Sequence, residues 1–108
     1  MHMITKDEVL SLLKSVEDPE LYISIVDLGL IYRVEISDKK DEPKIKIVMT
    51  LTTPGCPLGG TIDMLIRDAL FPLKEINVDQ DVEIQVTFDP PWSIEMMTQE
   101  ARAELGIE

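Results

Sequence analysis

The chain has 108 residues, 44% of them hydrophobic and 29% charged, and its 21 acidic and 10 basic residues give a formal net charge of −11. This acidic balance argues against nucleic acid and anionic membranes as partners, because phosphate groups are bound by clustered Lys and Arg. No apolar run reaches the ~20 residues that a membrane-spanning helix needs.

The length predicts a single domain over residues 1–108. Met1 and His2 are interpreted as a remnant of an expression sequence, with Met3 as the natural start. Without His2 the chain has no histidine, which excludes Cys–His catalysis and zinc sites built on imidazole. One cysteine allows no internal disulfide and fits a cytoplasmic protein.

The first half of the chain predicts a helix followed by a hairpin. Thr5 and Glu8 have the spacing of a capping box, and the helix that they begin is expected to end at Asp18-Pro19. Residues 20–29 lack a clear period and are expected to cover the core irregularly. Residues 30–37 and 44–52 alternate between apolar and polar side chains, which predicts two antiparallel strands.

The second half predicts a helix, a strand and a short last helix. A helical stripe runs from Leu58 to Leu70, and the strand that follows carries apolar residues at alternate positions. Thr98 is the expected N-cap of the last helix, over residues 99–105. The order α-β-β-α-β-α predicts a two-layer α+β domain, with helices on one face of a three-stranded sheet. The apolar alternation in the third strand is carried by Val82, Ile84, Val86 and Phe88.

The loop between the second predicted strand and the second predicted helix holds the only cysteine, Cys56. Pro57 suits the first helical position, so Cys56 is predicted to be the N-cap. A thiol at this end of the helix dipole is biased towards thiolate, which is both a nucleophile and a metal ligand. The alternative is a buried, inert cysteine in a turn shaped by glycines.

Several polar side chains are expected near this cysteine loop. If the second helix is an ordinary crossover, the strands before and after it are parallel, and their ends lie on one rim. That rim would include Thr52, Thr53 and Trp92, with Asp27 beside them and Glu20 as a further candidate. Trp92 can equally fill the core with its N–H bonded to a backbone carbonyl, and Asp27 can equally bond its own turn.

The motifs along the chain resemble those of the SufT/PaaD-type family of iron–sulfur cluster assembly proteins. Because the chain has no second, cysteine-containing C-terminal region of the PaaD kind, it is more similar to the stand-alone SufT type. The motifs are Asp18-Pro19-Glu20, Ile25-Val26-Asp27-Leu28-Gly29-Leu30-Ile31, Met49-Thr50-Leu51-Thr52-Thr53-Pro54-Gly55-Cys56-Pro57, Pro90-Pro91-Trp92 and Ala101-Arg102-Ala103-Glu104-Leu105-Gly106.

The resemblance implies a small cytosolic α+β protein that matures or delivers iron–sulfur clusters and is not an enzyme. It implies that Cys56 is the functional residue, as a transient ligand of iron or of a cluster, with assembly machinery and client apoproteins as partners. Clusters usually need four ligands, so one thiolate cannot hold a cluster alone. Two copies in a homodimer could share it, a partner could supply the missing ligands, or the domain could bind no metal and only dock clients.

Two other function classes fit parts of the sequence. A thiol-based redox enzyme would use Cys56 as its nucleophile, although the chain has no resolving cysteine. A protein-interaction module would use a structural Cys56 and an apolar patch that includes Met96 and Met97, expected to be exposed near Trp92.

Overall fold

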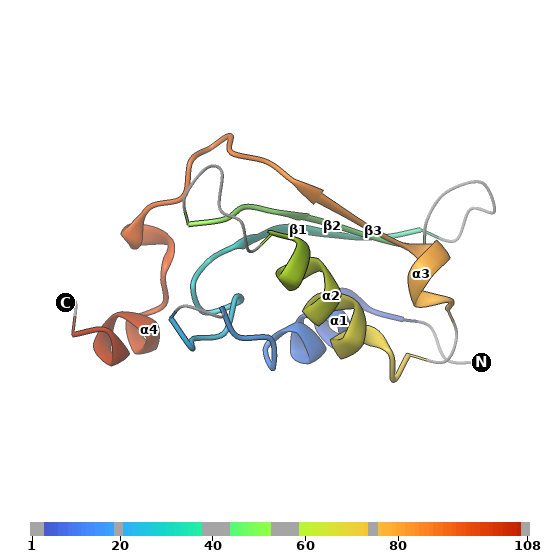
Figure 1. Ribbon diagram of the computed structural model, residues 1–108, viewed down its shortest axis with the longest axis horizontal. Helices are drawn as coiled ribbons and strands as arrows, with labels where there is room; N and C mark the ends of the chain where they lie inside the picture. Colours follow the sequence, from blue (N-terminus) through green and yellow to red (C-terminus); the bar gives the residue numbers. More distant parts are fainter. Residues whose placement is uncertain (1–3, 19–20, 38–43, 53–58, 74–75, 107–108) are drawn as a thin grey trace.

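The structure is a computed structural model that describes residues 4–18, 21–37, 44–52, 59–73 and 76–106 (Figure 1). Its sheet has three strands in the order β1-β2-β3, and the fold is the predicted α+β class. The elements are α1 (Lys6–Leu13), β1 (Ile31–Ile36), β2 (Ile45–Met49), α2 (Gly59–Leu70), α3 (Val78–Asp81), β3 (Val82–Val86), the 3-10 helix η1 (Ile94–Met96) and α4 (Gln99–Glu104).

Strand β2 lies between β1 and β3 and organises the sheet. It pairs antiparallel with β1, which confirms the predicted hairpin, and parallel with β3, as an ordinary crossover through α2 requires. Ile47 lies opposite Val34 on one side and Ile84 on the other. Figure 1 shows α1 and α2 on one side of the sheet, and α4 beyond its end.

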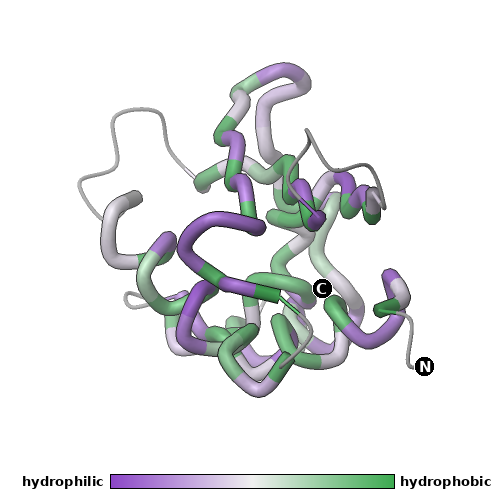
Figure 2. The backbone as a smooth tube through the Cα atoms, turned by 90° about the vertical axis from the view of Figure 1, so that its right-hand side faces the viewer, coloured by the Kyte–Doolittle hydropathy of each residue, from purple (hydrophilic) through white to green (hydrophobic). Residues whose placement is uncertain are grey.

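The core lies between the sheet and helices α1 and α2. Ile45, Ile47, Met49 and Leu51 are all buried, which confirms the inward face predicted from the alternation. Helix α2 buries Ile62, Ile66 and Leu70 at helical spacing against them. The irregular segment before β1 also covers the core, as predicted, through Ile23, Ile25 and Leu28. Figure 2 shows hydrophobic and hydrophilic residues interleaved along the backbone.

Helix α1 begins as predicted but ends earlier. The Thr5 side chain accepts from the Glu8 N–H and the Glu8 carboxylate accepts from the Thr5 N–H, which completes the capping box. The helix ends at Leu13 rather than at Asp18, because the Ser15 N–H and hydroxyl both turn back to the Leu12 carbonyl. Residue Glu17 then forms an isolated bridge with Ser24 and leads the chain into the irregular segment.

Three further details differ from the predicted pattern. The pairing of β1 with β2 shifts between Ile31 and Arg33, so the alternation of β1 is interrupted by an irregularity. Strand β3 ends at Val86, and Phe88 beyond it is 40% exposed. Helix α3 was not predicted; the Asn77 side chain caps it by accepting from the Asp79 and Gln80 N–H groups.

Within the described residues, no helix is long and apolar enough to cross a membrane.

Candidate functional site

A tight turn between Ser24 and Leu30 carries Asp27. The N–H groups of Leu28 and Gly29 donate to the carbonyls of Ser24 and Val26, and the Ser24 hydroxyl oxygen accepts from the Val26 N–H. These local bonds wind residues 24–29 so tightly that Leu28 points into the core while Asp27 stays partly exposed. The Asp27 carboxylate is therefore carried by a turn whose backbone is held by hydrogen bonds and by the buried Leu28 side chain.

Gly29 allows this turn to pack against the segment that follows β3. Its φ is +78°, in the left-handed region where a side chain is strained. A Cβ placed on it would collide with the backbone carbonyl of Met96. The residue type at position 29 thus decides whether the chain around η1 can lie against the Asp27 turn.

The segment from Pro90 to Thr98 is fastened to this region by three hydrogen bonds to main-chain carbonyls, and the Tyr32 hydroxyl also lies 3.5 Å from the Met96 sulfur. The Trp92 indole N–H donates to the Leu28 carbonyl at 2.6 Å. The Thr98 N–H donates to the Asp27 carbonyl at 2.9 Å, and the Tyr32 hydroxyl donates to the Pro90 carbonyl at 2.8 Å. Trp92 is partly buried and packs against the core. Its N–H is bonded to a backbone carbonyl, as expected from the alternative in which Trp92 fills the core.

The attachment of this segment also buries a residue predicted to be exposed. Met97 is only 5% exposed and belongs to the core, so the expected patch of two exposed methionines is wrong. Ala101, on α4, is buried with it. The C-terminal segment therefore closes one end of the core, beyond the strands.

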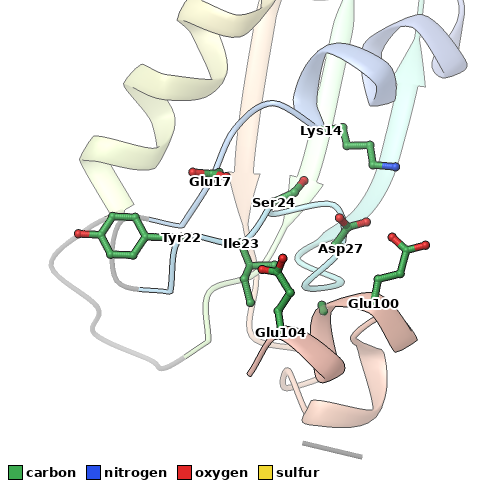
Figure 3. Close-up of a pocket in the computed structure, with 9 residues that line it drawn as sticks. Lys14, Glu17, Tyr22, Ile23, Ser24, Asp27, Glu100 and Glu104 are labelled. Carbon is green, nitrogen blue, oxygen red and sulfur yellow. The ribbon is translucent and has the colours of Figure 1, made fainter. Parts of the chain in front are cut away.

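A pocket of about 240 Å³ opens between the Asp27 turn, the end of α1 and α4 (Figure 3). Figure 3 shows the side chains of Lys14, Asp27 and Glu100 on one side of it and those of Glu17 and Tyr22 on the other. Its lining is strongly acidic, with the single ammonium of Lys14 among carboxylates. The lining residues are Lys14, Glu17, Tyr22, Ile23, Ser24, Asp27, Glu100, Ala101 and Glu104.

Sequence reasoning missed most of this pocket. It predicted Asp27 as a site residue, and it predicted α4 with the spacing that sets Glu100 and Glu104 on neighbouring turns, but it did not join the two. The signal was the Thr98 cap: its side chain accepts from the Ala101 N–H while its backbone N–H bonds the Asp27 carbonyl. Only the second of these bonds docks α4, and a sequence pattern does not encode it.

The end of β2 lies beside the start of β1, as a hairpin requires. The Thr50 N–H donates to the Leu30 carbonyl at 2.9 Å, and Thr50 is completely buried. Thr52 is partly buried in a bend two residues later. The Asp27 turn, the end of β2 and Trp92 are thus linked by hydrogen bonds through Leu28 and Leu30.

Three of the predicted site residues lie outside the described residues. These are Glu20, Thr53 and Cys56, so the prediction that Cys56 is the N-cap of the second helix also lies outside the described residues. The described residues contain no group of three or more His, Cys, Asp or Glu side chains arranged to hold a metal ion. Among the residues that the structure describes, the carboxylates of the acidic pocket thus do not form such a group.

A model of the protein family described as "Iron-sulfur cluster assembly protein" matches residues 6–86. The chain is 37% identical over 108 residues to the Fe-S protein maturation auxiliary factor YitW of Bacillus subtilis, with full coverage of both chains. It is 41% identical over 90 residues to the Fe-S protein maturation auxiliary factor SufT of Staphylococcus aureus, covering 83% of this chain and 96% of that one.

A solved structure has the same fold. The crystal structure of a domain of unknown function from Bacillus anthracis superposes with a TM-score of 0.83 at 36% identity, covering 95% of this chain and 92% of that one. This coverage of 95% extends over more of the chain than the family model, which ends at residue 86.

Proposed function

The chain belongs to the family of iron–sulfur cluster assembly proteins, and we propose that it is a maturation factor that delivers iron or an iron–sulfur cluster to client apoproteins through Cys56. The observation that carries this proposal is the full-length similarity to a protein named as a maturation auxiliary factor. The cluster, or its iron, is cargo in this role and is handed on.

The delivery step follows from the number of ligands. The chain has one cysteine, whereas iron–sulfur clusters are usually held by four thiolates. A site with an incomplete set of ligands binds weakly and can release its cargo when a client offers more thiolates. We therefore place the remaining ligands on a partner protein of the assembly machinery, in preference to a second copy of this chain.

The polar groups near the end of β2 suit a supporting role. In this proposal Asp27, Thr52 and Trp92, with Glu20 and Thr53, border the place where Cys56 meets its cargo. The Asp27 turn is rigid because the Trp92 and Thr98 N–H groups hold two of its carbonyls. A rigid border helps a single thiolate by keeping its neighbours in place while ligands exchange.

In this role the protein needs no catalytic residues, so it acts as a carrier and not as an enzyme. The same proposal places the protein in the cytoplasm. The reaction is an exchange of thiolate ligands at iron: the client's thiolates bind the iron, and the Cys56 thiolate leaves. No electron is transferred in this exchange.

The test is anaerobic reconstitution with ferrous iron and sulfide, followed by absorption spectroscopy, native mass spectrometry and transfer to an apo-enzyme that needs a cluster. We expect the wild-type chain to speed recovery of the apo-enzyme's activity in the presence of a thiol-bearing assembly partner. The Cys56→Ser variant should lose this effect. The Ser11→Ala variant, altered at an exposed position of α1, should keep it.

Full delivery by Cys56→Ser would contradict the role of the thiolate. If one cluster is found per two copies of the chain in the absence of any partner, the cluster is shared within a homodimer and not with a partner protein.

A further inference from the structure

Strand β3 forms an edge of the sheet, because among the described residues only β2 pairs with it. The register runs without a break from Ile45 opposite Val82 to Met49 opposite Val86, and the Thr87 N–H extends it by donating to the Met49 carbonyl at 2.8 Å. In a parallel pair, successive residues bond alternately to one side and the other. The N–H and C=O groups of Ile84 and Val86 therefore face away from β2.

The start of this edge is already covered. The Arg67 guanidinium donates from Nη1 to the carbonyls of Val78 and Val82, at 2.8 and 3.0 Å. Beyond Val82, no other described strand pairs with this edge, and the exposed fractions of Val86 and Phe88 are 42% and 40%. The open part is the stretch Ile84-Gln85-Val86-Thr87-Phe88, which we call the β3 edge.

The composition of the β3 edge favours pairing with another strand. It has no charged residue, in a chain of which 29% is charged. Its β-branched and aromatic residues are those that fit a pleated strand best. Its register with β2 contains no bulge as far as Val86, and the first proline, Pro90, comes after it.

The opposite edge of the sheet is protected in the ways that sheet edges usually are. Strand β1 carries Arg33 and Glu35, which form an ion pair at 3.3 Å, and its pairing with β2 is irregular between Ile31 and Arg33. Charges and irregularities of this kind discourage a further strand. The two edges of the sheet thus differ: β1 carries charges and an irregular register, whereas the β3 edge is accessible to a further strand.

We propose that the β3 edge binds an extended segment of a partner protein as an additional strand, and that this segment is apolar in its middle and carries Lys or Arg at both ends. Main-chain hydrogen bonds to Ile84 and Val86 would supply much of the affinity. Asp79 and Asp81 precede the edge and Asp89 follows it, within a chain of net charge −11. Basic ends on the segment complement these carboxylates.

The same charges disfavour a second copy of this chain as the additional strand. An antiparallel pair centred on Gln85, which joins Ile84 of each copy to Val86 of the other, would set Asp81 opposite Asp89. A pair centred on Val86 would set Glu83 opposite Asp89, and like charges directly opposite are destabilising. A pair centred on Ile84 avoids this clash but needs the Val82 carbonyl, where the Arg67 guanidinium already lies. The proposed binding surface does not include Cys56, so it can be tested on the protein without cargo.

The probe is a nine-residue synthetic peptide with Lys at both ends and alternating Val and Thr between them. We expect saturable binding by isothermal titration calorimetry, together with slower amide hydrogen exchange at Ile84 and Val86 measured by NMR. A peptide with Glu at both ends should bind on the order of tenfold more weakly. A peptide with a central Pro, which removes main-chain pairing, should lose affinity by a similar factor or more.

Two variants of the chain complete the test. Val86→Lys places a charge on the β3 edge and should abolish peptide binding. Ile94→Lys is the matched control, since Ile94 is 45% exposed, lies in η1, and receives the same charge; it should bind the peptide like the wild type. Circular dichroism checks that both variants are folded.

Three results would overturn the proposal: no binding of the Lys-ended peptide, binding that leaves the exchange of Ile84 and Val86 unchanged, or equal binding of the Glu-ended peptide. Sedimentation of the free protein as a dimer that Val86→Lys dissociates would assign the β3 edge to a second copy instead.

Discussion

The indole N–H of Trp92 and the carbonyl of Leu28 are joined by a 2.6 Å hydrogen bond between residues 64 positions apart in the sequence. This bond ties the segment after β3 to the turn that presents Asp27. Because Leu28 itself is completely buried, water is poorly placed to replace the indole as the donor to its carbonyl.

Replacing Trp92 by Phe should therefore loosen the turn as well as destabilise the protein. An unpaired carbonyl and the lost indole contacts together should lower the free energy of unfolding by about 2 kcal/mol. Urea denaturation measures this loss, and amide hydrogen exchange should become faster from Asp27 to Gly29. Tyr32→Phe is the control, since its hydroxyl bonds the Pro90 carbonyl and the Met96 sulfur but no group of the turn itself. Equal exchange in both variants would show that Trp92 does not hold the turn.

Gly29 and Gly106 form a matched pair for a test of close packing. Both have positive φ, +78° and +75°, but a Cβ at Gly29 would strike the Met96 carbonyl, whereas one at Gly106 would meet nothing within 4 Å. Gly106→Ala should cost about 1 kcal/mol from the backbone alone. Gly29→Ala should cost at least about 3 kcal/mol, because it adds overpacking to the same strain. Thermal unfolding compares them, and similar losses would contradict the contact with Met96.

The two threonine caps predict localised effects. The Thr98 side chain accepts from the Ala101 N–H at 3.2 Å, and the Thr5 side chain accepts from the Glu8 N–H at 3.2 Å. Each Thr→Ala change should cost about 1 kcal/mol. Only Thr98→Ala should speed amide exchange in α4, because Thr5 caps the first turn of α1, at the opposite end from the pocket that α1 shares with α4. A loss of protection in α4 caused by Thr5→Ala would show that the caps are coupled.

Helix α2 offers a contrast between a buried and an exposed apolar side chain. Ile66 is completely buried against the sheet, whereas Phe71, just beyond the helix, is 78% exposed. Ile66→Ala should lower the free energy of unfolding by about 2–5 kcal/mol through lost burial and a cavity. Phe71→Ala should change it by only about 0.5 kcal/mol. A large effect of Phe71→Ala on the free energy of unfolding would mean that the Phe71 side chain makes stabilising contacts in solution.

The candidate site shows where prediction from the sequence stops. Asp27 is predicted because it precedes a Leu-Gly-Leu turn, and Trp92 because it closely follows the third predicted strand. Neither position reveals that Asp27 shares a pocket with Lys14, Glu17 and Glu100, which come from both ends of the chain. The roles of Glu20, Thr53 and Cys56 stay predictions, since those residues lie outside the described part of the structure.

The sequence by itself determined the capping box of α1, the alternation that pairs β1 with β2, and the Thr98 cap of α4. These features depend on residues a few positions apart, whose hydrogen bonds and side-chain directions follow from backbone geometry alone. The tertiary structure decided that α4 docks on the Asp27 turn and that the Arg67 guanidinium reaches the carbonyls of Val78 and Val82. Those contacts depend on the paths of irregular segments, which no repeating pattern specifies.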